Sequence, residues 1–329
     1  MKIFNLESEM HLSECRKKVF VFVTLLIIIL IVYSNTFDAS WHFDDEQNIT
    51  DNPSIHLEEL SWHTIKKTFF SKQLEPGQLY RPVACLSFAL NYYVGGKNVF
   101  GYHIVNISIH LLTAFFLFLF IYQTLNLPLL KAKYGPSSYF ISSLATVLWA
   151  INPIQTQAVT YIVQRMASMA GMFYILSMYL YIKGRITTLR LLKILLFFLC
   201  ALSIILAFFS KENAIMIPAS LFLLDFLLIQ GTSNENMKKN IKIFSIIALA
   251  ILAAGTIYYF SFTEAKFSSF FSLYEIRPFT PWQRLLTQFR VIIFYISLLF
   301  YPMSTRLSLA HDIAISRSLL DLSLIHISE

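Results

Sequence analysis

Charged residues are scarce in this chain. Asp, Glu, Lys and Arg together make up 14% of the 329 residues, whereas 56% are apolar and 16% are aromatic. A soluble globular domain carries roughly 25% charged residues, so the composition excludes an ordinary soluble domain and indicates a multi-pass membrane protein. The abundant Phe and Tyr, 31 and 17 residues, suit lipid-facing and interfacial positions.

Cysteine is rare as well. Cys15, Cys85 and Cys200 stand in three different contexts, which excludes a disulfide framework and a CxxC metal motif. The sequence also has no low-complexity segment and no internal repeat that we can identify. The net charge of +7 includes many basic residues in loops between apolar segments, and we therefore expect no nucleic-acid partner.

Several apolar segments are long enough to cross a bilayer, since a span needs about 20 residues, or fewer inside a bundle. We predict eight spans, at 19–34, 103–125, 138–152, 163–182, 190–209, 213–230, 241–261 and 289–303. A secretory signal peptide is the alternative for the first of them. The polar tail 1–18 is long, however, and no small-x-small cleavage site follows, so an uncleaved anchor with a cytoplasmic tail is favoured.

The connecting loops predict the orientation. One set of loops holds nine basic residues: Lys131, Lys133, Lys183, Arg185, Arg190, Lys193, Lys238, Lys239 and Lys242. The short loops between them hold only Arg165 and Lys211. By the positive-inside rule, the basic loops are cytoplasmic. The outer loops are then 35–102, 152–165, 210–213 and 262–288.

The first outer loop, 35–102, contains two segments with helical character. Residues 82–94 are apolar but short, and if they crossed, every later loop would change side; we expect a juxtamembrane or re-entrant helix. Residues 55–70 are amphipathic, which predicts a helix lying on the outer surface.

An acidic turn follows the first span directly. Asp44 and Asp45 lie behind the aromatic residues Trp41 and Phe43. Carboxylates this close to hydrocarbon cost free energy unless they are paired or used. A solvated turn is the plain alternative, because Asp and Asn favour turns. The functional interpretation is favoured because the other polar motifs fall on the same side of the membrane.

A polar helix face follows the first outer loop. His103, Asn106 and His110 are spaced three and four residues apart and share one face of the helix, with His103 at the outer rim. We expect Asn106 and His110 to form interhelical hydrogen bonds. Two histidines two turns apart cannot chelate a metal without a third ligand, so no metal ligand is predicted; a divalent ion stays an open alternative.

Cationic groups stand at the outer ends of later spans. Gln164 and Arg165 open one span, and the guanidinium suits a bidentate phosphate contact; snorkelling to the interface is the alternative. Lys211 and Glu212 form a tight polar turn between two spans. Arg81 precedes the short apolar segment, where it can pair with Asp44 or Asp45.

These motifs form an ordered set. The set is Phe43-Asp44-Asp45, Asn52-Pro53, Arg81-Pro82, Gly101-Tyr102-His103 with Asn106 and His110, Asn152-Pro153-Ile154-Gln155-Thr156-Gln157-Ala158-Val159, Gln164-Arg165 and Ser210-Lys211-Glu212. It resembles the membrane part of the transmembrane-and-tetratricopeptide-repeat O-mannosyltransferase family and its bacterial relatives, over roughly residues 20–230. The resemblance implies an all-α, GT-C-like polytopic bundle, a polyprenyl-phosphate-linked sugar donor and a downstream repeat domain.

We therefore expect a tail at 1–18, a GT-C-like transmembrane domain at 19–303 and a truncated segment at 304–329. Its last residues look like translated sequencing adapter, and we expect the chain to be a fragment. The membrane is expected to be the bacterial inner membrane with a periplasmic site, or the endoplasmic reticulum with a luminal site in a eukaryote.

The expected function is transfer of a mannose-like sugar from the lipid carrier to a protein or glycan hydroxyl. Asp44 and Asp45 are the candidate catalytic carboxylates, with Asp45 favoured as general base. The candidate substrate-binding residues are Arg81, His103, Gln164, Arg165, Lys211 and Glu212. Two other functions compete: a membrane anchor for a repeat scaffold, and a lipid-linked sugar transporter or flippase, which would need ionisable groups at mid-membrane.

Overall fold

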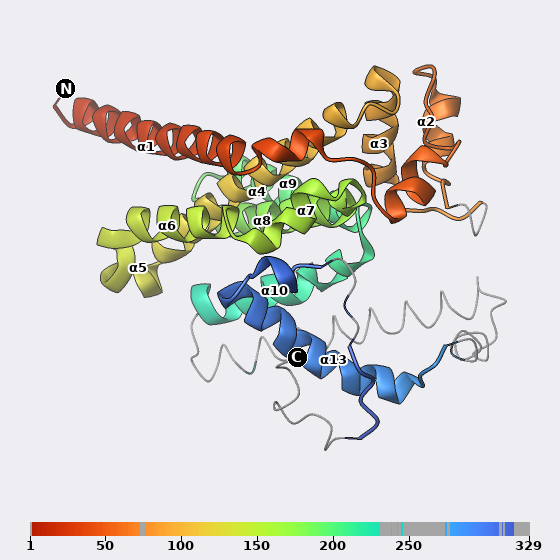
Figure 1. Cartoon of the computed structure of the whole chain (residues 1–329). Helices are drawn as coiled ribbons and strands as arrows, with labels where there is room; N and C mark the ends of the chain where they lie inside the picture. Colours follow the sequence, from red (N-terminus) through yellow and green to blue (C-terminus); the bar gives the residue numbers. More distant parts are fainter. Residues whose placement is uncertain are drawn as a thin grey trace. The chain divides into compact units, whose positions relative to one another are not determined.

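The computed structural model describes residues 2–72, 77–230, 277–308, 311 and 313–318, with isolated positions 238, 242, 245 and 274; side chains are described from residue 14 onward. Every regular element of the described part is a helix, and this part contains no strand, which confirms the all-α prediction. The chain divides into two units, Met1–Thr232 and Ser233–Glu329. All candidate site residues lie in the first unit (Figure 1).

Four described helices are long and apolar enough to cross a membrane: Val99–Leu125, Arg190–Phe208, Glu212–Ile229 and Pro281–Phe300. They confirm four of the expected spans. The expected segments 19–34, 138–152 and 163–182 fall largely in helices α1 (Lys2–Val32), α6 (Ser138–Ala150) and α8 (Arg165–Ile186).

Helices α1, α6 and α8 are not among the four helices that are long and apolar enough to cross a membrane, and the reason differs for each. The basic run before residue 19 enters any long window of α1, α6 has only 13 residues, and small and polar residues lower the hydropathy of α8. The expected span 241–261 lies almost entirely outside the described residues. The count of eight is therefore not confirmed.

Helix α4 (Val99–Leu125) is the centre of the first unit. It packs against α1, α6 and α8, and α8 in turn packs against α9 (Arg190–Phe208). Asn98 caps the start of α4, because its side-chain Oδ1 accepts the N–H of Phe100 at 3.1 Å. Buried residues along α4 thus face three helices at once, which fixes the bundle around them.

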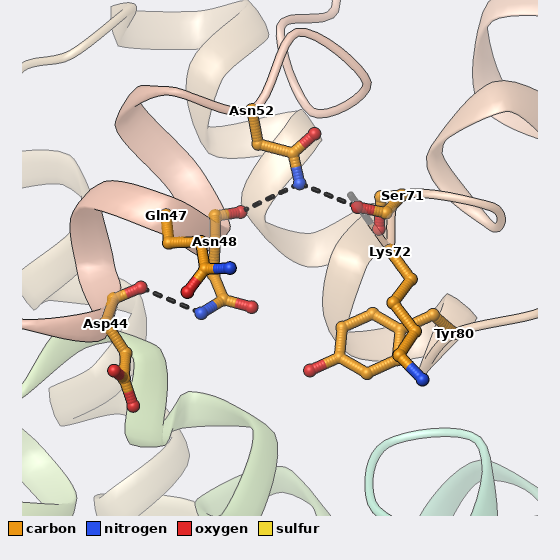
Figure 2. A pocket seen from close by; sticks show the side chains of 7 residues that line it. All are labelled: Asp44, Gln47, Asn48, Asn52, Ser71, Lys72 and Tyr80. Atoms are coloured by element: carbon orange, nitrogen blue, oxygen red, sulfur yellow. Dashed lines mark hydrogen bonds between the residues drawn. The ribbon is translucent and has the colours of Figure 1, made fainter. Parts of the chain in front are cut away.

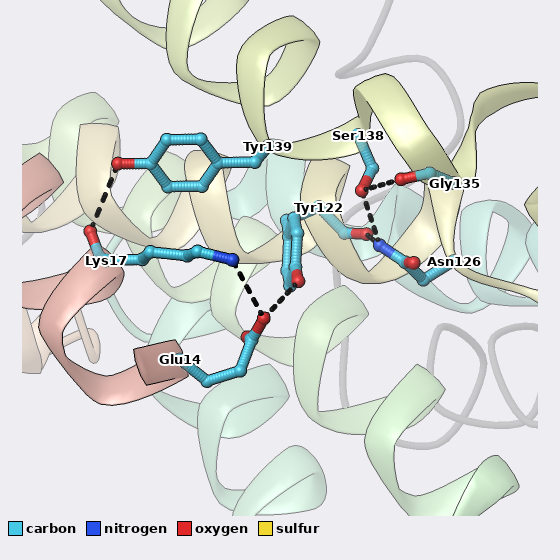
Figure 3. Close-up of polar contacts among 7 residues, drawn as sticks. All are labelled: Glu14, Lys17, Tyr122, Asn126, Gly135, Ser138 and Tyr139. Carbon is cyan, nitrogen blue, oxygen red and sulfur yellow. Dashed lines mark hydrogen bonds and ion pairs between the residues drawn. The ribbon is translucent and has the colours of Figure 1, made fainter. Parts of the chain in front are cut away.

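The N-terminal half of α1 is attached to this bundle by polar contacts (Figure 3). Glu14 pairs with Lys17 at 3.8 Å and accepts the Tyr122 hydroxyl of α4 at 2.9 Å. Tyr139 of α6 donates to the carbonyl of Lys17 at 3.4 Å. These contacts hold the start of the apolar part of α1 against α4 and α6.

The first outer loop folds onto the other end of the bundle. Ile49 and Ile55 are at most 1% exposed and belong to one core cluster with Phe88, Tyr102 and Met166 of the neighbouring helices. Helices α2 and α3 lie side by side there, away from the N-terminus of α1 (Figure 1). The loop is therefore packed against the bundle, and its polar residues have fixed positions.

Both helices predicted in this loop are present, with one correction. Helix α3 (Pro82–Gly95) matches the short apolar segment; Pro82 starts it, and the chain turns at Gly96, whose φ is +58°. The amphipathic helix predicted over 55–70 is only Trp62–Thr68 (α2). Ser61 and Thr64 form a capping box that starts α2 there, and Ile55 and Leu57 are drawn into the core instead.

Candidate functional site

The two adjacent aspartates have opposite environments. Asp45 is fully buried, and its carboxylate accepts the backbone N–H of His42 at 3.0 Å and of Val163 at 2.7 Å. Burial raises the pKa of Asp45, and the hydrogen bonds from His42 and Val163 oppose that shift. A carboxylate this enclosed attaches the loop to the start of α8 and is poorly placed to meet a substrate.

Asp44 is exposed instead. Its backbone is held on both sides: the N–H donates to the Tyr161 hydroxyl at 3.0 Å, and the carbonyl accepts the Asn48 side-chain amide at 2.8 Å. The preceding residue, Phe43, has a φ of +44°, a left-handed conformation that is strained for a bulky side chain. The chain thus presents the Asp44 side chain from a fixed and strained turn.

Asp44 lines a polar cavity of about 220 Å³ in the first outer loop. Figure 2 shows Asp44, Gln47 and Asn48 on one side of it and Tyr80 on the other, with Asn52 between them. The Asn52 amide donates to the carbonyls of Asn48 at 3.3 Å and Ser71 at 2.9 Å. Ser71 and Lys72 complete the lining. A carboxylate among amides and hydroxyls suits a sugar or another hydroxylated ligand.

Arg165 is completely buried at the start of α8. Its guanidinium donates to the Asn106 side chain at 2.7 Å, the Asn91 side chain at 2.6 Å, the Ser87 carbonyl at 3.2 Å and the Tyr102 carbonyl at 2.9 Å. Four of its N–H groups are therefore used inside the protein. In this structure Arg165 therefore joins α3, α4 and α8, and its phosphate contact stays a prediction.

Aromatic rings complete the environment of Arg165. Its guanidinium lies over the rings of Phe88 at 4.7 Å and Tyr102 at 5.5 Å. Asn106 also donates to the carbonyls of Val159 at 3.1 Å and Ile162 at 3.4 Å. Asp45 accepts the N–H of Val163. The segment 159–163 is therefore bound both by Asn106 and by Asp45. We call Asp45, Asn91, Asn106 and Arg165 the buried junction.

Arg81 does not pair with either aspartate, which corrects that prediction. Its guanidinium binds Glu212 through Nε at 3.0 and 3.1 Å and through Nη2 at 2.8 Å. Burial disfavours the charged form of Arg81, but the hydrogen bond with Glu212 and the electrostatic interactions with Tyr80, Glu212 and Cys85 together raise the pKa of Arg81. The group also lies 4.9 Å over the ring of Tyr80, a wall of the Asp44 cavity.

Lys211 lies beside this pair in the sequence. Among the described residues, no hydrogen bond or ion pair engages its ammonium group. Burial lowers the pKa of Lys211, and the charge of Arg81 lowers it further. We call Asp44, Arg81, Lys211 and Glu212 the open rim, because each is exposed or half-buried.

The remaining predicted residues are in less direct positions. His103 is buried, and its Nε2 lies 2.9 Å from the Ala39 carbonyl; Nδ1 has no hydrogen-bond partner among the described residues. Gln164 is half-buried directly before α8. His110 contacts the Ala150 carbonyl at 2.9 Å, an interhelical bond as predicted, and Asn106 behaves likewise.

Three functional positions escaped the sequence analysis. Asn91 accepts a hydrogen bond from Arg165. The Tyr161 hydroxyl accepts the N–H of Asp44, and the ring of Tyr80 lies between the cavity and the Arg81 guanidinium. Asn91 had a usable signal, because it is an amide in an otherwise apolar helix. Within the described residues, no group of three or more His, Cys, Asp or Glu side chains is arranged to hold a metal ion.

The comparisons with known proteins agree with the resemblance in the motifs. Protein O-mannosyl-transferase tmtc2 of Xenopus laevis is 34% identical over 159 residues, which are 47% of this chain and 18% of that protein. TMTC4 of Mus musculus is 30% identical, over 45% of this chain and 21% of its own length. F38B6.6 of Caenorhabditis elegans is 26% identical, over 62% and 28%.

The curated homologues of this chain are thus TMTC O-mannosyltransferases. They match about half of it, as expected for the membrane part of that family. The chain itself spans only about a fifth to a quarter of the length of these relatives. No family model matches the chain, and no solved structure matches it.

Proposed function

We propose that this protein is a GT-C-type glycosyltransferase that moves mannose from a polyprenyl-phosphate carrier to a hydroxyl of a protein on the outer face of the membrane. The names of the homologues support a mannosyltransferase. The observation that carries the mechanism is the exposed Asp44 at a polar cavity, with Arg81 beyond Tyr80 in its wall. The outer face is the periplasm in a bacterium and the lumen in a eukaryote.

In the proposed reaction, the residues of the open rim have two different roles. Asp44 accepts the proton of the acceptor hydroxyl while that oxygen attacks the anomeric carbon. The bond from this carbon to the phosphate oxygen breaks, and the phosphate leaves with the bonding electrons. Arg81 and Lys211 stabilise the charge on the departing phosphate. Direct displacement inverts the anomeric centre.

In this proposal Asp44, and not Asp45, is the base, and the burial of the two carboxylates supports that choice. A general base must come within hydrogen-bond reach of the proton that it removes. Asp45 is fully buried, and each of its oxygens accepts a backbone N–H, whereas Asp44 lines the cavity. In this proposal the buried junction, including Arg165, positions the base and does not contact the donor.

The competing functions account for less of the geometry. A transporter needs ionisable groups on a central path, yet the described acidic residue deepest in the predicted spans, Asp225, is paired with Arg185 at 2.6 Å. An anchor for a repeat scaffold explains the spans, but it gives no reason for a strained turn that presents Asp44 to a polar cavity.

The test is a transfer assay with purified protein in lipid nanodiscs, polyprenyl-phosphate mannose and a protein acceptor. Asp44→Asn keeps the shape of the side chain but removes the proton acceptor, and transfer should fall by about a hundredfold or more. Asp38→Asn is the matched control, because Asp38 is exposed in the same loop and lies outside the cavity lining. Undiminished transfer by Asp44→Asn would end the mechanism.

A further inference from the structure

The ion pair between Arg81 and Glu212 has the geometry of a ligand complex. Both carboxylate oxygens accept from the guanidinium, and all three hydrogen bonds are between 2.8 and 3.1 Å. Arginine binds carboxylates and phosphates with the same fork of N–H groups. A phosphodiester also presents two oxygens that share one negative charge. The carboxylate of Glu212 and a lipid phosphate are therefore interchangeable partners for Arg81.

The pair is accessible to an incoming ligand. The side chain of Glu212 is 61% exposed, and that of Arg81 is 22% exposed. The Arg81 guanidinium also lies over the Tyr80 ring at 4.9 Å and donates to the Met166 sulfur at 3.1 Å. The arginine is thus the anchored partner, and the glutamate is the one that can move away.

The backbone of Arg81 points to a functional need for this side chain. Its φ of +42° is left-handed, a conformation that is strained for a non-glycine residue. The following Pro82 further restricts the conformation of Arg81. Glycine would relieve the strain but would remove the guanidinium. Strain of this kind is typical of binding sites.

Lys211 supplies a second positive charge beside the pair. Its ammonium group has no partner among the described residues, so it does not compete for Glu212 in this structure. Arg81 and Lys211 carry two positive charges, and Glu212 carries one negative charge. One further negative charge on a ligand would make this group neutral.

We propose that Glu212 is an internal stand-in for the donor phosphate: it occupies the guanidinium of Arg81 while the site is empty, and the lipid phosphate displaces it on binding. This inference rests on the proposed function, because it concerns the same donor. Glu212 then keeps Arg81 in its binding conformation, and weak anions of the medium must compete with it. The removal of its charge should make the phosphate bind more tightly.

The experiment measures binding of undecaprenyl phosphate to the full chain in phosphatidylcholine nanodiscs, with uncharged undecaprenol as the reference lipid. Glu212→Gln should bind the phosphate roughly two- to fivefold more tightly than the native chain, the range expected for an exposed ion pair. Glu58→Gln is the matched control: it makes the same charge change in an exposed residue of the first outer loop that does not contact Arg81. Its affinity should stay at the native value.

Two further variants separate displacement from a structural role. Arg81→Lys keeps the charge but loses the fork, so it should weaken phosphate binding. Glu212→Asp keeps the charge on a shorter side chain and should give an affinity between those of the native chain and Glu212→Gln. If Glu212→Gln binds the phosphate no better than the native chain, Glu212 only holds Arg81 in place structurally, and the inference fails.

The proposed function fails by a different result. If the native chain and Glu212→Gln bind undecaprenyl phosphate no better than undecaprenol, the lipid-phosphate donor itself is wrong. If the native chain prefers the phosphate and transfer depends on Asp44, but Glu212→Gln leaves affinity unchanged, only the displacement is wrong.

Discussion

The buried junction and the open rim lie next to each other, and they treat charge in opposite ways. In the junction, Arg165 uses four N–H groups on protein acceptors, and Asp45 accepts two backbone donors. In the rim, Lys211 has no partner among the described residues, and Arg81 has an exposed one. The difference separates residues that hold the site in place from residues that are available to a ligand.

The comparison is sharpest where the two kinds of residue are neighbours in the sequence. Asp44 and Asp45 are adjacent, yet only Asp44 reaches the cavity. Their side chains are the same, so residue type alone does not assign the roles. Stability measurements should distinguish the two roles. Substitution of a buried, fully hydrogen-bonded side chain costs far more unfolding free energy than substitution of an exposed one.

The largest effect is expected at Arg165. Arg165→Leu leaves the side-chain oxygens of Asn91 and Asn106 and two carbonyls without their donor, which should cost about 3–5 kcal/mol of unfolding free energy. Arg190→Leu is the control, because Arg190 is an exposed arginine at a helix end. Equal stability of the two variants would contradict the junction.

Thermal unfolding is measurable with a thiol-reactive dye. Cys85 and Cys200 are buried and become reactive only when the bundle opens, whereas Cys15 is exposed and is first replaced by Ser. Every stability variant is made in the chain that carries Cys15→Ser.

The next effect is expected at Asp45. Asp45→Ala removes the acceptor for the N–H groups of His42 and Val163, which should cost about 1–3 kcal/mol. Burial raises the pKa of this carboxyl. Its contribution to stability is therefore greatest below its unfolded pKa near 4 and falls as the pH rises through the folded value.

The difference in Tm between the native chain and Asp45→Ala should accordingly narrow between pH 4 and pH 7. Asp38→Ala serves as the control, because Asp38 is exposed in the same loop. A difference that widens with pH would mean that Asp45 is stabilised as a carboxylate.

The smallest effect on stability is expected at Asp44. Asp44→Asn keeps both backbone hydrogen bonds, to Tyr161 and from Asn48, and should change the unfolding free energy by at most about 0.5 kcal/mol. A Tm loss like that of Asp45→Ala would show that the two carboxylates share a structural role.

Much of the helical architecture was predictable from apolar length and loop charge. Helix α4 and the short helix α3 lie where the apolar segments indicated. The segment 55–70 was less predictable, because its apolar residues also suit a loop that packs Ile55 and Leu57 into the core. Periodicity does not distinguish a surface helix from a loop that is buried by tertiary contacts.

The candidate site was predictable as a set of residues but not as a set of partners. The sequence predicts that Asp44, Asp45, Arg81, Arg165 and Lys211 lie at one end of the bundle. Which carboxylate is buried depends on Val163, more than a hundred residues away, and the partner of Arg81 depends on the turn at Glu212. Contacts between distant segments have no local pattern, so the four protein acceptors of Arg165 could not be predicted from the sequence.

The hydrogen bond from Val163 to Asp45 has a consequence for how this loop tolerates insertions and deletions. Surface loops usually accept changes in length. Here the chain from the end of α1 to Asp45 must span a fixed distance, and a shift of one residue would put Asp44 or Glu46 in the buried position. The length of the loop before Asp44 and Asp45 therefore determines which carboxylate faces the cavity.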